Sequence, residues 1–186
     1  MVIDAGGLGA LSLDTGVLDP NLLAQMESSL ILTPHPGEMA RLTRSTVPQI
    51  QRRRWEIATE KAREWGSIVV LKGAHTAIAF PDGELFINPT GNSALATAGS
   101  GDVLTGMITG LLAQGLTPQQ ATLAGVYLHG LAGDLLAAGE GERGHVAGEA
   151  LAYIPKAMNM AAEFRLGVEP GELCPLRSLN GKNSDN

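Results

Sequence analysis

Several residue types on which whole classes of protein depend are scarce in this chain. Cys174 is the single cysteine among 186 residues, so the chain can form neither an internal disulfide nor a metal site of several cysteines. Such usage is typical of a reducing compartment. The 13 basic residues are outnumbered by 19 acidic ones, and the net charge of −6 argues against a nucleic-acid partner, because phosphate backbones bind basic stripes.

Aromatic residues and uninterrupted apolar runs are scarce as well. Only 4% of the chain is aromatic while 44% is hydrophobic, so a sizeable core must consist of aliphatic residues, alanine and methionine. The longest apolar tracts, residues 103–113 and 121–138, contain several glycines, which argues against membrane spans. The first residues, Met-Val-Ile-Asp, do not have the pattern of a signal peptide. We therefore expect a cytoplasmic protein with no membrane partner.

Glycine, by contrast, is abundant at 24 residues, which suits a loop-rich α/β nucleotide-binding protein better than a helical bundle. Strand–helix units come first along the chain and a helical layer follows, a pattern that predicts an α/β sandwich. The end of the chain is rich in Gly, Pro, Ser and Asn, so we expect a mobile tail over residues 167–186. The predicted strands are residues 1–3, 30–32, 67–71, 76–80 and 85–87, and the predicted helices are residues 19–28, 37–42, 47–65, 102–114, 118–138 and 146–164.

The stretch from Asn92 to Gly106 combines a Gly-rich loop, one acid and an apolar helical pattern. Such a loop bares backbone N–H groups, and the following helix points its positive end at the same place, which suits phosphate. Asp102 is placed to accept the proton of a hydroxyl that attacks phosphorus. Taken alone, the glycines are explained better by a tight turn and Asp102 by a helix N-cap, and the company of the other motifs favours the phosphate site.

Three further segments are candidate ligand loops, because each follows a strand or opens a helix. In Thr33–Glu38, His35 lies between two prolines that hold its backbone extended, so its imidazole can bind a substrate; an idle surface turn is the alternative. In residues 72–76, Lys72 can meet a nucleotide phosphate as a point charge; a tight hairpin with a solvated lysine is the alternative. The turn over residues 88–92 is expected to shape the Gly-rich loop; a hydrogen bond to a ligand is the alternative.

No metal cage is evident in the sequence. Phosphoryl transfer nevertheless uses a divalent ion, and we expect Mg²⁺, which keeps most of its waters and needs few protein ligands. Gly99, Gly101 and the helix N–H groups would stabilise charge on the transferring phosphate. His129 and Asp134 lie in an apolar helical pattern and are expected to be polar groups satisfied by packing, and His145 is expected only to form the entry to the last helix.

Together these segments resemble one known family. The chain resembles the ADP/ATP-dependent NAD(P)H-hydrate dehydratases, ribokinase-like proteins that are often the C-terminal half of a bifunctional repair enzyme whose other half is an epimerase. The resemblance runs from residue 1 to about residue 166, and the motifs come in the family's order. They read ILTPHPGEMARL over residues 31–42, VVLKGAHTAI over 69–78, NPTGNSALATAGSGDVLTGMITGLLAQG over 88–115 and AGVYLHGLAGDLLAA over 124–138.

The resemblance implies a ribokinase-like three-layer sandwich over residues 1–166, with a central, mostly parallel sheet and helices on both faces. It also implies metabolite repair: ADP or ATP phosphorylates the accidental hydroxyl of hydrated NADH or NADPH (NADHX, NADPHX), and elimination of phosphate restores the cofactor. By similarity, Asp102 is the catalytic base, and His35 and Asp102 contact the hydrated cofactor. The residues that the resemblance assigns to the adenine nucleotide are Lys72, Gly73, Ala74, His75, Thr76 and Gly101.

Two departures from the family's pattern bear on activity. The family's first motif is usually Asp-Ala-Asp followed by Leu-Asn, whereas here Gly6 and Gly9 stand in place of the second acid and the amide. The family domain also has further strands upstream, so we expect an N-terminally truncated domain with an exposed sheet edge. A ribokinase-like kinase for a thiazole or hydroxymethylpyrimidine and an inactive nucleotide-binding fragment are the alternatives. The resemblance further implies a homo-oligomer, a tetramer.

Overall fold

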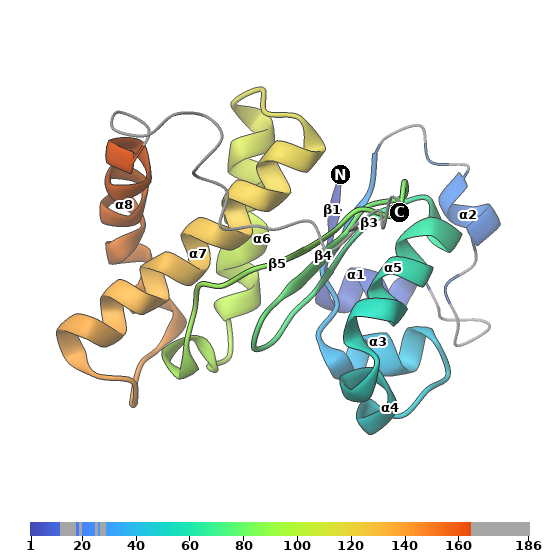
Figure 1. Ribbon diagram of the computed structural model, residues 1–186, viewed down its shortest axis with the longest axis horizontal. Coiled ribbons are helices and arrows are strands. Elements are labelled where there is room, and N and C mark those ends of the chain that lie inside the picture. The colour runs from blue at the N-terminus through green and yellow to red at the C-terminus, as the bar shows by residue number, and fades with distance from the viewer. Residues whose placement is uncertain (12–17, 19, 25, 27–28, 165–186) are drawn as a thin grey trace, which may run out of the picture. The chain divides into compact units, whose positions relative to one another are not determined.

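Figure 1 shows the computed structural model of the chain, which describes residues 1–11, 18, 20–24, 26 and 29–164. Within this range the chain forms two compact parts, one built chiefly from Ile3–Ile87 and the other from residues 88–164. Each part is described by itself below. The tail predicted over residues 167–186 and several residues of the helix predicted over 19–28 lie outside the described residues.

The first part contains a five-stranded sheet whose spatial order follows the chain: β1 (Val2–Ile3), β2 (Ile31–Leu32), β3 (Ile68–Leu71), β4 (Ala77–Ala79) and β5 (Leu85–Ile87). β3 runs parallel to β2 and antiparallel to β4, and β4 runs antiparallel to β5. The backbone bonds between β1 and β2 advance in the same sense along both strands, so this pair is parallel. The sheet is therefore mixed, whereas the resemblance implied a mostly parallel one. Short turns join β3, β4 and β5, and such turns connect only antiparallel strands.

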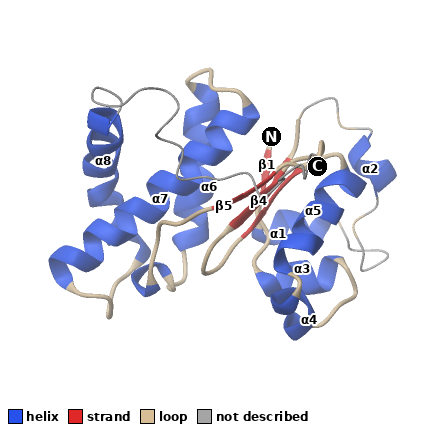
Figure 2. Ribbon diagram, in the orientation of Figure 1, coloured by secondary structure: helices blue, strands red, loops and turns tan. Residues whose placement is uncertain are grey.

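The helices of the first part are α1 (Ala5–Ala10), α2 (Pro20–Ala24), α3 (Pro36–Leu42), α4 (Val47–Arg52) and α5 (Arg54–Trp65). Figure 2 distinguishes these helices from the strands and loops of the same part. Alternate residues of the strands pack against them, because successive strand side chains point to opposite faces of a sheet. The fully buried members of this core include Leu8, Leu32, Met39, Leu42, Ile50, Val69 and Leu71.

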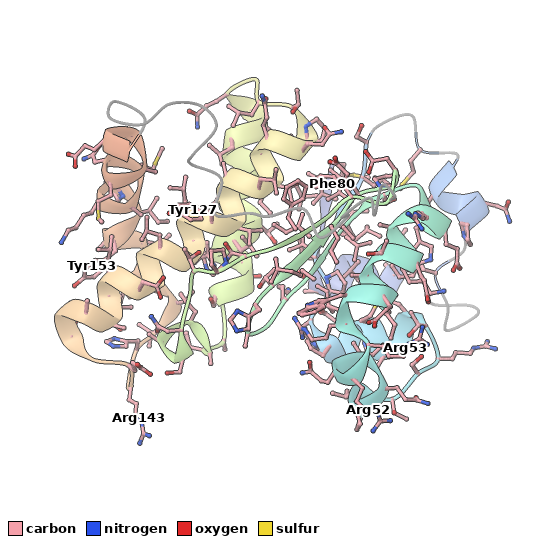
Figure 3. All side chains as sticks on the ribbon, in the orientation of Figure 1. Arg52, Arg53, Phe80, Tyr127, Arg143 and Tyr153 are labelled. Atoms are coloured by element: carbon pink, nitrogen blue, oxygen red, sulfur yellow. The ribbon has the colours of Figure 1, made fainter. Side chains whose placement is uncertain are left out.

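The helix predicted over residues 47–65 is in fact two helices. Arg53 separates α4 from α5 with φ −128° and ψ 38°, outside the helical region. The break turns Arg54 inward, where its guanidinium donates hydrogen bonds to the carbonyl oxygens of Leu71 and Lys72 at 3.1 and 3.2 Å. Arg53 instead reaches Glu60 at the surface (Figure 3). The helical periodicity of residues 47–65 could not reveal the break at Arg53, because the contact that accompanies it joins Arg54 to residues 17 and 18 positions away.

The second part contains a short 3₁₀ turn, η1 (Ser93–Leu95), and three helices: α6 (Ser100–Ala113), α7 (Pro118–Glu140) and α8 (Ala147–Phe164). α7 packs against both α6 and α8, and Leu128, Ala132 and Ala157 form one buried cluster of this packing. The predicted N-cap of α7 is confirmed. The hydroxyl of Thr117, the residue before Pro118, accepts a hydrogen bond from the Gln120 N–H.

α7 is long and apolar enough to cross a membrane by length and composition alone. However, 56% of its most apolar stretch is buried within the protein, as in a core helix. Gly130 and Gly133 are among its buried residues and allow Thr90 and Leu95, which lie ahead of α6, to approach the helix backbone closely. The interruptions that argued against a membrane span therefore serve packing.

Candidate functional site

His35 lies where the sequence placed it, on a rigid turn that opens α3. Its backbone is extended, with φ −79° and ψ 168°, and its ring Nδ1 accepts hydrogen bonds from the N–H groups of Gly37 and Glu38 at 3.0 and 3.2 Å. The Glu38 carboxylate in turn accepts the His35 backbone N–H at 2.7 Å, which completes a capping box. Because Nδ1 accepts, Nε2 carries the proton in the neutral ring. Nε2 lies 3.5 Å from a Glu38 carboxylate oxygen, and 55% of the His35 side chain is exposed, so a ligand that reaches Nε2 would share it with Glu38.

Lys72, at the end of β3, is not the solvated lysine of the alternative interpretation. Its ammonium lies 2.6 Å from an Asp4 carboxylate oxygen and 4.0 Å from Glu38, and only 18% of its side chain is exposed. Its backbone N–H donates to the Pro34 carbonyl at 2.9 Å, so the His35 turn and the Lys72 loop are adjacent. Asp4, which follows β1, thus joins two loops whose motifs lie far apart in the sequence.

The ionised form of Asp4 is favoured within this cluster. Burial alone would raise the pKa of the Asp4 carboxyl, but the hydrogen bond and charge of Lys72, with the Ala5 N–H and the Thr33 hydroxyl, lower it below its ordinary 3.8. A lowered pKa in the folded state stabilises the fold above the ordinary pKa, and this contribution is lost as the pH falls through the lowered value.

We therefore expect Asp4→Asn to reduce the free energy of unfolding by about 3 kcal/mol near neutral pH, because it leaves a mostly buried ammonium without its closest partner. Below the ordinary Asp4 pKa of 3.8 the difference between parent and variant should shrink. Urea unfolding at several pH values measures both effects. Glu60→Gln, which removes the exposed partner of Arg53, is the control and should cost less than about 1 kcal/mol. A difference independent of pH would contradict the assigned charge pair.

The loop of residues 72–76 connects β3 to β4 as a tight turn with most of its surface exposed. Gly73 has φ +136°, and a Cβ there would lie 3.0 Å from the Arg54 guanidinium, so this position suits glycine. His75 also has a positive φ, 54°, and the Thr76 hydroxyl donates to the Gly73 carbonyl at 3.0 Å. Arg54 on one side and Thr76 on the other thus fix the backbone of the predicted nucleotide loop.

In the second part, the turn over residues 88–92 is held against α7 by side chains. The carboxylate of Asp134 accepts the Gly91 N–H at 3.0 Å and the Asn92 side-chain amide at 2.8 Å. The Thr90 hydroxyl donates to the Tyr127 carbonyl at 2.9 Å. The turn is thus tied to α7, while its predicted role in shaping the Gly-rich loop stays a prediction. The expectation that Asp134 is a satisfied polar group is confirmed.

The Gly-rich loop ends at Gly99, whose φ of +89° is left-handed, and α6 begins at Ser100 without a side-chain cap. The first N–H groups of α6 are therefore not occupied by the usual capping hydroxyl or carboxylate, an arrangement that suits an anion. Asp102 lies in the first turn of α6 and is exposed. Within the described part of the chain its carboxylate has no hydrogen-bond or ion-pair partner, so it is not an N-cap.

The remaining histidines of the second part have structural contacts. His129 is buried in α7, and its Nε2 lies 3.3 Å from the Ser100 hydroxyl at the start of α6. His145 contacts the Gly141 carbonyl and Glu149 at the entry to α8, as expected. Ser100 had no predicted role; a buried hydroxyl next to a glycine loop gives no sequence pattern that would have singled it out.

The predicted site residues thus fall into two groups by part of the chain. In the first, His35 and Lys72 are brought together by Asp4 and Glu38, to which the sequence alone gave no role. The available signal for Asp4 was an acid directly after a strand. In the second, Gly101 and Asp102 share the first turn of α6.

Comparisons of the sequence with protein families and with curated proteins agree with one another. A family model described as NAD(P)H-hydrate dehydratase matches residues 1–156. The bifunctional NAD(P)H-hydrate repair enzyme of Moorella thermoacetica is 52% identical over 171 residues, covering 91% of this chain and 31% of that enzyme. The ADP-dependent (S)-NAD(P)H-hydrate dehydratase of Bacillus subtilis is 49% identical over 123 residues, covering 66% and 45%.

A solved structure resembles the fold. The ADP/ATP-dependent NAD(P)H-hydrate dehydratase from Bacillus subtilis, co-crystallised with ATP and Mg²⁺ and soaked with CoA, superposes with a TM-score of 0.76 at 40% identity. The match covers 86% of this chain and 55% of that protein. This chain therefore spans between 31% and 55% of the length of the relatives compared.

Proposed function

This chain belongs to the NAD(P)H-hydrate dehydratase family, and we propose that it restores hydrated NADH and NADPH to the reduced cofactors at the expense of ADP or ATP. The ribokinase-like α/β fold expected from the sequence is confirmed by its solved relatives. The observation that carries the proposal is the exposed carboxylate of Asp102, which has no bonding partner among the described residues. It lies on the first turn of a helix whose N–H groups have no side-chain cap.

Asp102 is proposed as the catalytic base. As the hydroxyl oxygen of the hydrated ring bonds to phosphorus, Asp102 accepts the hydroxyl proton, and the bond from phosphorus to the remaining nucleotide breaks. The C–O bond to the new phosphate group then breaks, the neighbouring ring carbon loses a proton to solvent, and the ring double bond is restored. Inorganic phosphate departs in this step, and it is a far better leaving group than hydroxide. The N–H groups at Gly101 and along the first turn of α6 stabilise the negative charge on the transferring group.

We further propose which residues bind the hydrated cofactor and which bind the nucleotide. His35 offers Nε2 to the hydrated cofactor, because its Nδ1 is occupied by the start of α3. The nucleotide is assigned to Lys72, Gly73, Ala74, His75 and Thr76, with Gly101. Lys72 is held near neutralising carboxylates, so a nucleotide phosphate would have to compete with Asp4 for its ammonium. The exposed backbone of Gly73 gives a ligand close access.

Mg²⁺ fits the proposed site only as an ion that arrives with the nucleotide. Within the described residues, Asp102 is the free carboxylate on the first turn of α6, and no oxygen cage surrounds it. Mg²⁺ keeps several waters and typically uses one or two carboxylates beside substrate phosphates, which this donor set permits. When bound, it would neutralise charge on the phosphates.

The experiment that tests the function mixes the purified chain with hydrated NADH, Mg²⁺ and ADP or ATP, and follows the return of reduced-nicotinamide absorbance. Recovery of absorbance together with released phosphate supports the dehydratase. A phosphorylated product that accumulates without elimination would support the kinase alternative. No recovery, while a full-length relative works under the same conditions, would indicate the inactive fragment instead.

Gly6 and Gly9, where the family usually has an acid and an amide, can accept side chains. Both lie on α1, and a Cβ at either position would meet nothing within 4 Å. We expect the double variant Gly6→Asp with Gly9→Asn to fold, and to raise kcat/KM for hydrated NADH by about tenfold if each new polar group bonds the substrate. The matched control is Gly7→Ala, whose Cβ would lie 2.9 Å from the Ile3 side chain and which should only lower stability. Unchanged kinetics in the double variant would show that residues 4–9 do not contact the substrate.

Two properties of the whole protein follow from the same family resemblance. We propose that it acts in the cytoplasm, consistent with its single cysteine. We also propose a homo-oligomer, with a tetramer as the expected state. Sedimentation of the purified chain measures that state directly.

A further inference from the structure

Three potential metal ligands meet at the junction of α7 and α8, on residues to which the proposed function gives no role. Glu140 is the last residue of α7, His145 lies in the connecting loop, and Glu149 is in the first turn of α8. Each offers one ligand atom, and these three atoms all lie within 4.8 Å of one another. The side chains come from three successive pieces of structure.

The ring of His145 is oriented so that one of its nitrogens faces a carboxylate oxygen, an arrangement that a cation would stabilise. Its side chain is only 6% exposed, and Nε2 lies 2.8 Å from the Gly141 carbonyl oxygen. A carbonyl can only accept, so Nε2 carries a proton and Nδ1 of the neutral ring presents its lone pair. That lone pair faces a Glu149 carboxylate oxygen at 3.1 Å. Two acceptors at this distance repel unless a cation lies between them.

Both carboxylates are held in place by donors outside the three ligands. The Val146 N–H donates to Glu149 at 2.8 Å, and the Tyr153 hydroxyl donates to Glu140 at 2.7 Å. Tyr153 is the labelled side chain on α8 in Figure 3. The Gly141 carbonyl fixes the histidine ring in the same way. Metal-binding histidines and carboxylates usually have such second partners, which orient the ligands and fix the histidine tautomer.

We propose that Glu140, His145 and Glu149 bind a divalent transition-metal ion of the Zn²⁺ type, with His145 coordinating through Nδ1. One imidazole and two carboxylates with an open fourth position suit Zn²⁺, whereas Mg²⁺ prefers oxygen ligands alone. A cavity of about 350 Å³ borders His145 on the side of Ser93 and Glu142.

The geometry requires little rearrangement. Ligand atoms bonded to zinc at about 2.1 Å in a tetrahedron lie roughly 3.4 Å from each other. His145 Nδ1 and the Glu149 oxygen are already 3.1 Å apart, and the Glu140 oxygen lies within 4.8 Å of both. Any adjustment that tetrahedral binding requires thus falls on the exposed Glu140 side chain, with its Tyr153 partner. The bound ion would clip the end of α7 to the start of α8. This inference is independent of the proposed function, and its test uses neither nucleotide nor cofactor.

A proton is the competing occupant of the space between His145 and Glu149. The hydrogen bond to the Gly141 carbonyl, and then the Glu149 carboxylate, raise the pKa of His145 above its ordinary value. Protonation would satisfy the same lone pair without any metal. The test must therefore separate a metal site from a simple imidazolium–carboxylate pair.

The experiment titrates the purified chain with ZnCl₂ and follows heat, with Co²⁺ absorbance as a second signal for tetrahedral nitrogen and oxygen ligation. We expect one ion per chain, with affinity lowered at least about 100-fold in His145→Ala and Glu149→Gln and about tenfold in Tyr153→Phe. Glu142→Gln is the matched control, since Glu142 lies in the same loop but binds the Ser93 hydroxyl, and its zinc affinity should equal that of the parent.

Glu149→Gln preserves the shape of the side chain, so it also serves if His145→Ala unfolds the loop; circular dichroism establishes whether each variant is folded. A parent that binds zinc no more tightly than Glu149→Gln overturns the proposal. So does a parent whose zinc affinity is lost in His35→Ala and retained in His145→Ala. In either case the pair between His145 and Glu149 holds a proton.

Discussion

Asp102→Asn is expected to lower the rate of NAD(P)H-hydrate repair by about 10²–10⁴-fold while leaving the fold intact, the range typical of losing a general base. The side chain is exposed and bonds no other group in the described part of the chain, so the substitution removes no structural contact. The amide has nearly the same shape but cannot accept the hydroxyl proton. The loss should appear in kcat and kcat/KM together, since the proton moves only in the transition state.

The stability of this variant should change little. A carboxylate in the first turn of α6 interacts favourably with the helix dipole, and its loss costs about 0.3–1 kcal/mol at an exposed position. Asp82→Asn is a matched control, because Asp82 is also exposed and its side chain caps a turn by accepting the Glu84 N–H. That control should retain parental activity. Repair at the parental rate in Asp102→Asn would exclude Asp102 as the base and leave its place on α6 as a structural feature.

Gly130→Ala is expected to reduce the free energy of unfolding by about 3 kcal/mol, the upper end for overpacking a buried contact. A Cβ on Gly130 would lie 2.2 Å from the Thr90 hydroxyl oxygen and 2.7 Å from the Thr90 carbonyl carbon. The second of these is backbone, so a side-chain rotation cannot relieve the clash. The turn is also tied to α7 through the bond from Thr90 to the Tyr127 carbonyl, which must lengthen or break.

Urea denaturation measures this effect as a lower midpoint with an unchanged slope. Gly110→Ala on α6 is the matched control, because a Cβ there would meet nothing within 4 Å, and alanine in an exposed helix should stabilise by about 0.5–1 kcal/mol. The pair differs only in what surrounds the new methyl group. Equal stability changes at both positions would show that the turn over residues 88–92 does not hold α7 closely.

The sequence predicted elements well where the local signals agreed. Thr117 before Pro118 marked the start of α7, and His35 between two prolines marked an extended turn. It missed α1, because a segment with three glycines among its six residues has poor helix propensity. It also joined α4 and α5 into one helix, because apolar spacing continues across Arg53.

The candidate site shows a similar division. Asp102 was assigned from a Gly-rich loop followed by an apolar helix, and the structure adds that its carboxylate is unpaired among the described residues. For Lys72 the sequence left two interpretations open, a phosphate ligand or a solvated turn residue. The structure removes the second, since the ammonium is mostly buried against Asp4.

By itself, the sequence determined the α/β class, the family and the loops that carry the candidate residues, because these depend on periodicity and on motifs confined to short segments. Only the tertiary structure decided that Lys72 pairs with Asp4, that Arg54 holds the end of β3, and that β4 and β5 turn the sheet antiparallel. The ion pair joins residues 68 positions apart. Contacts of that range depend on how strands and helices pack, and no local pattern encodes them.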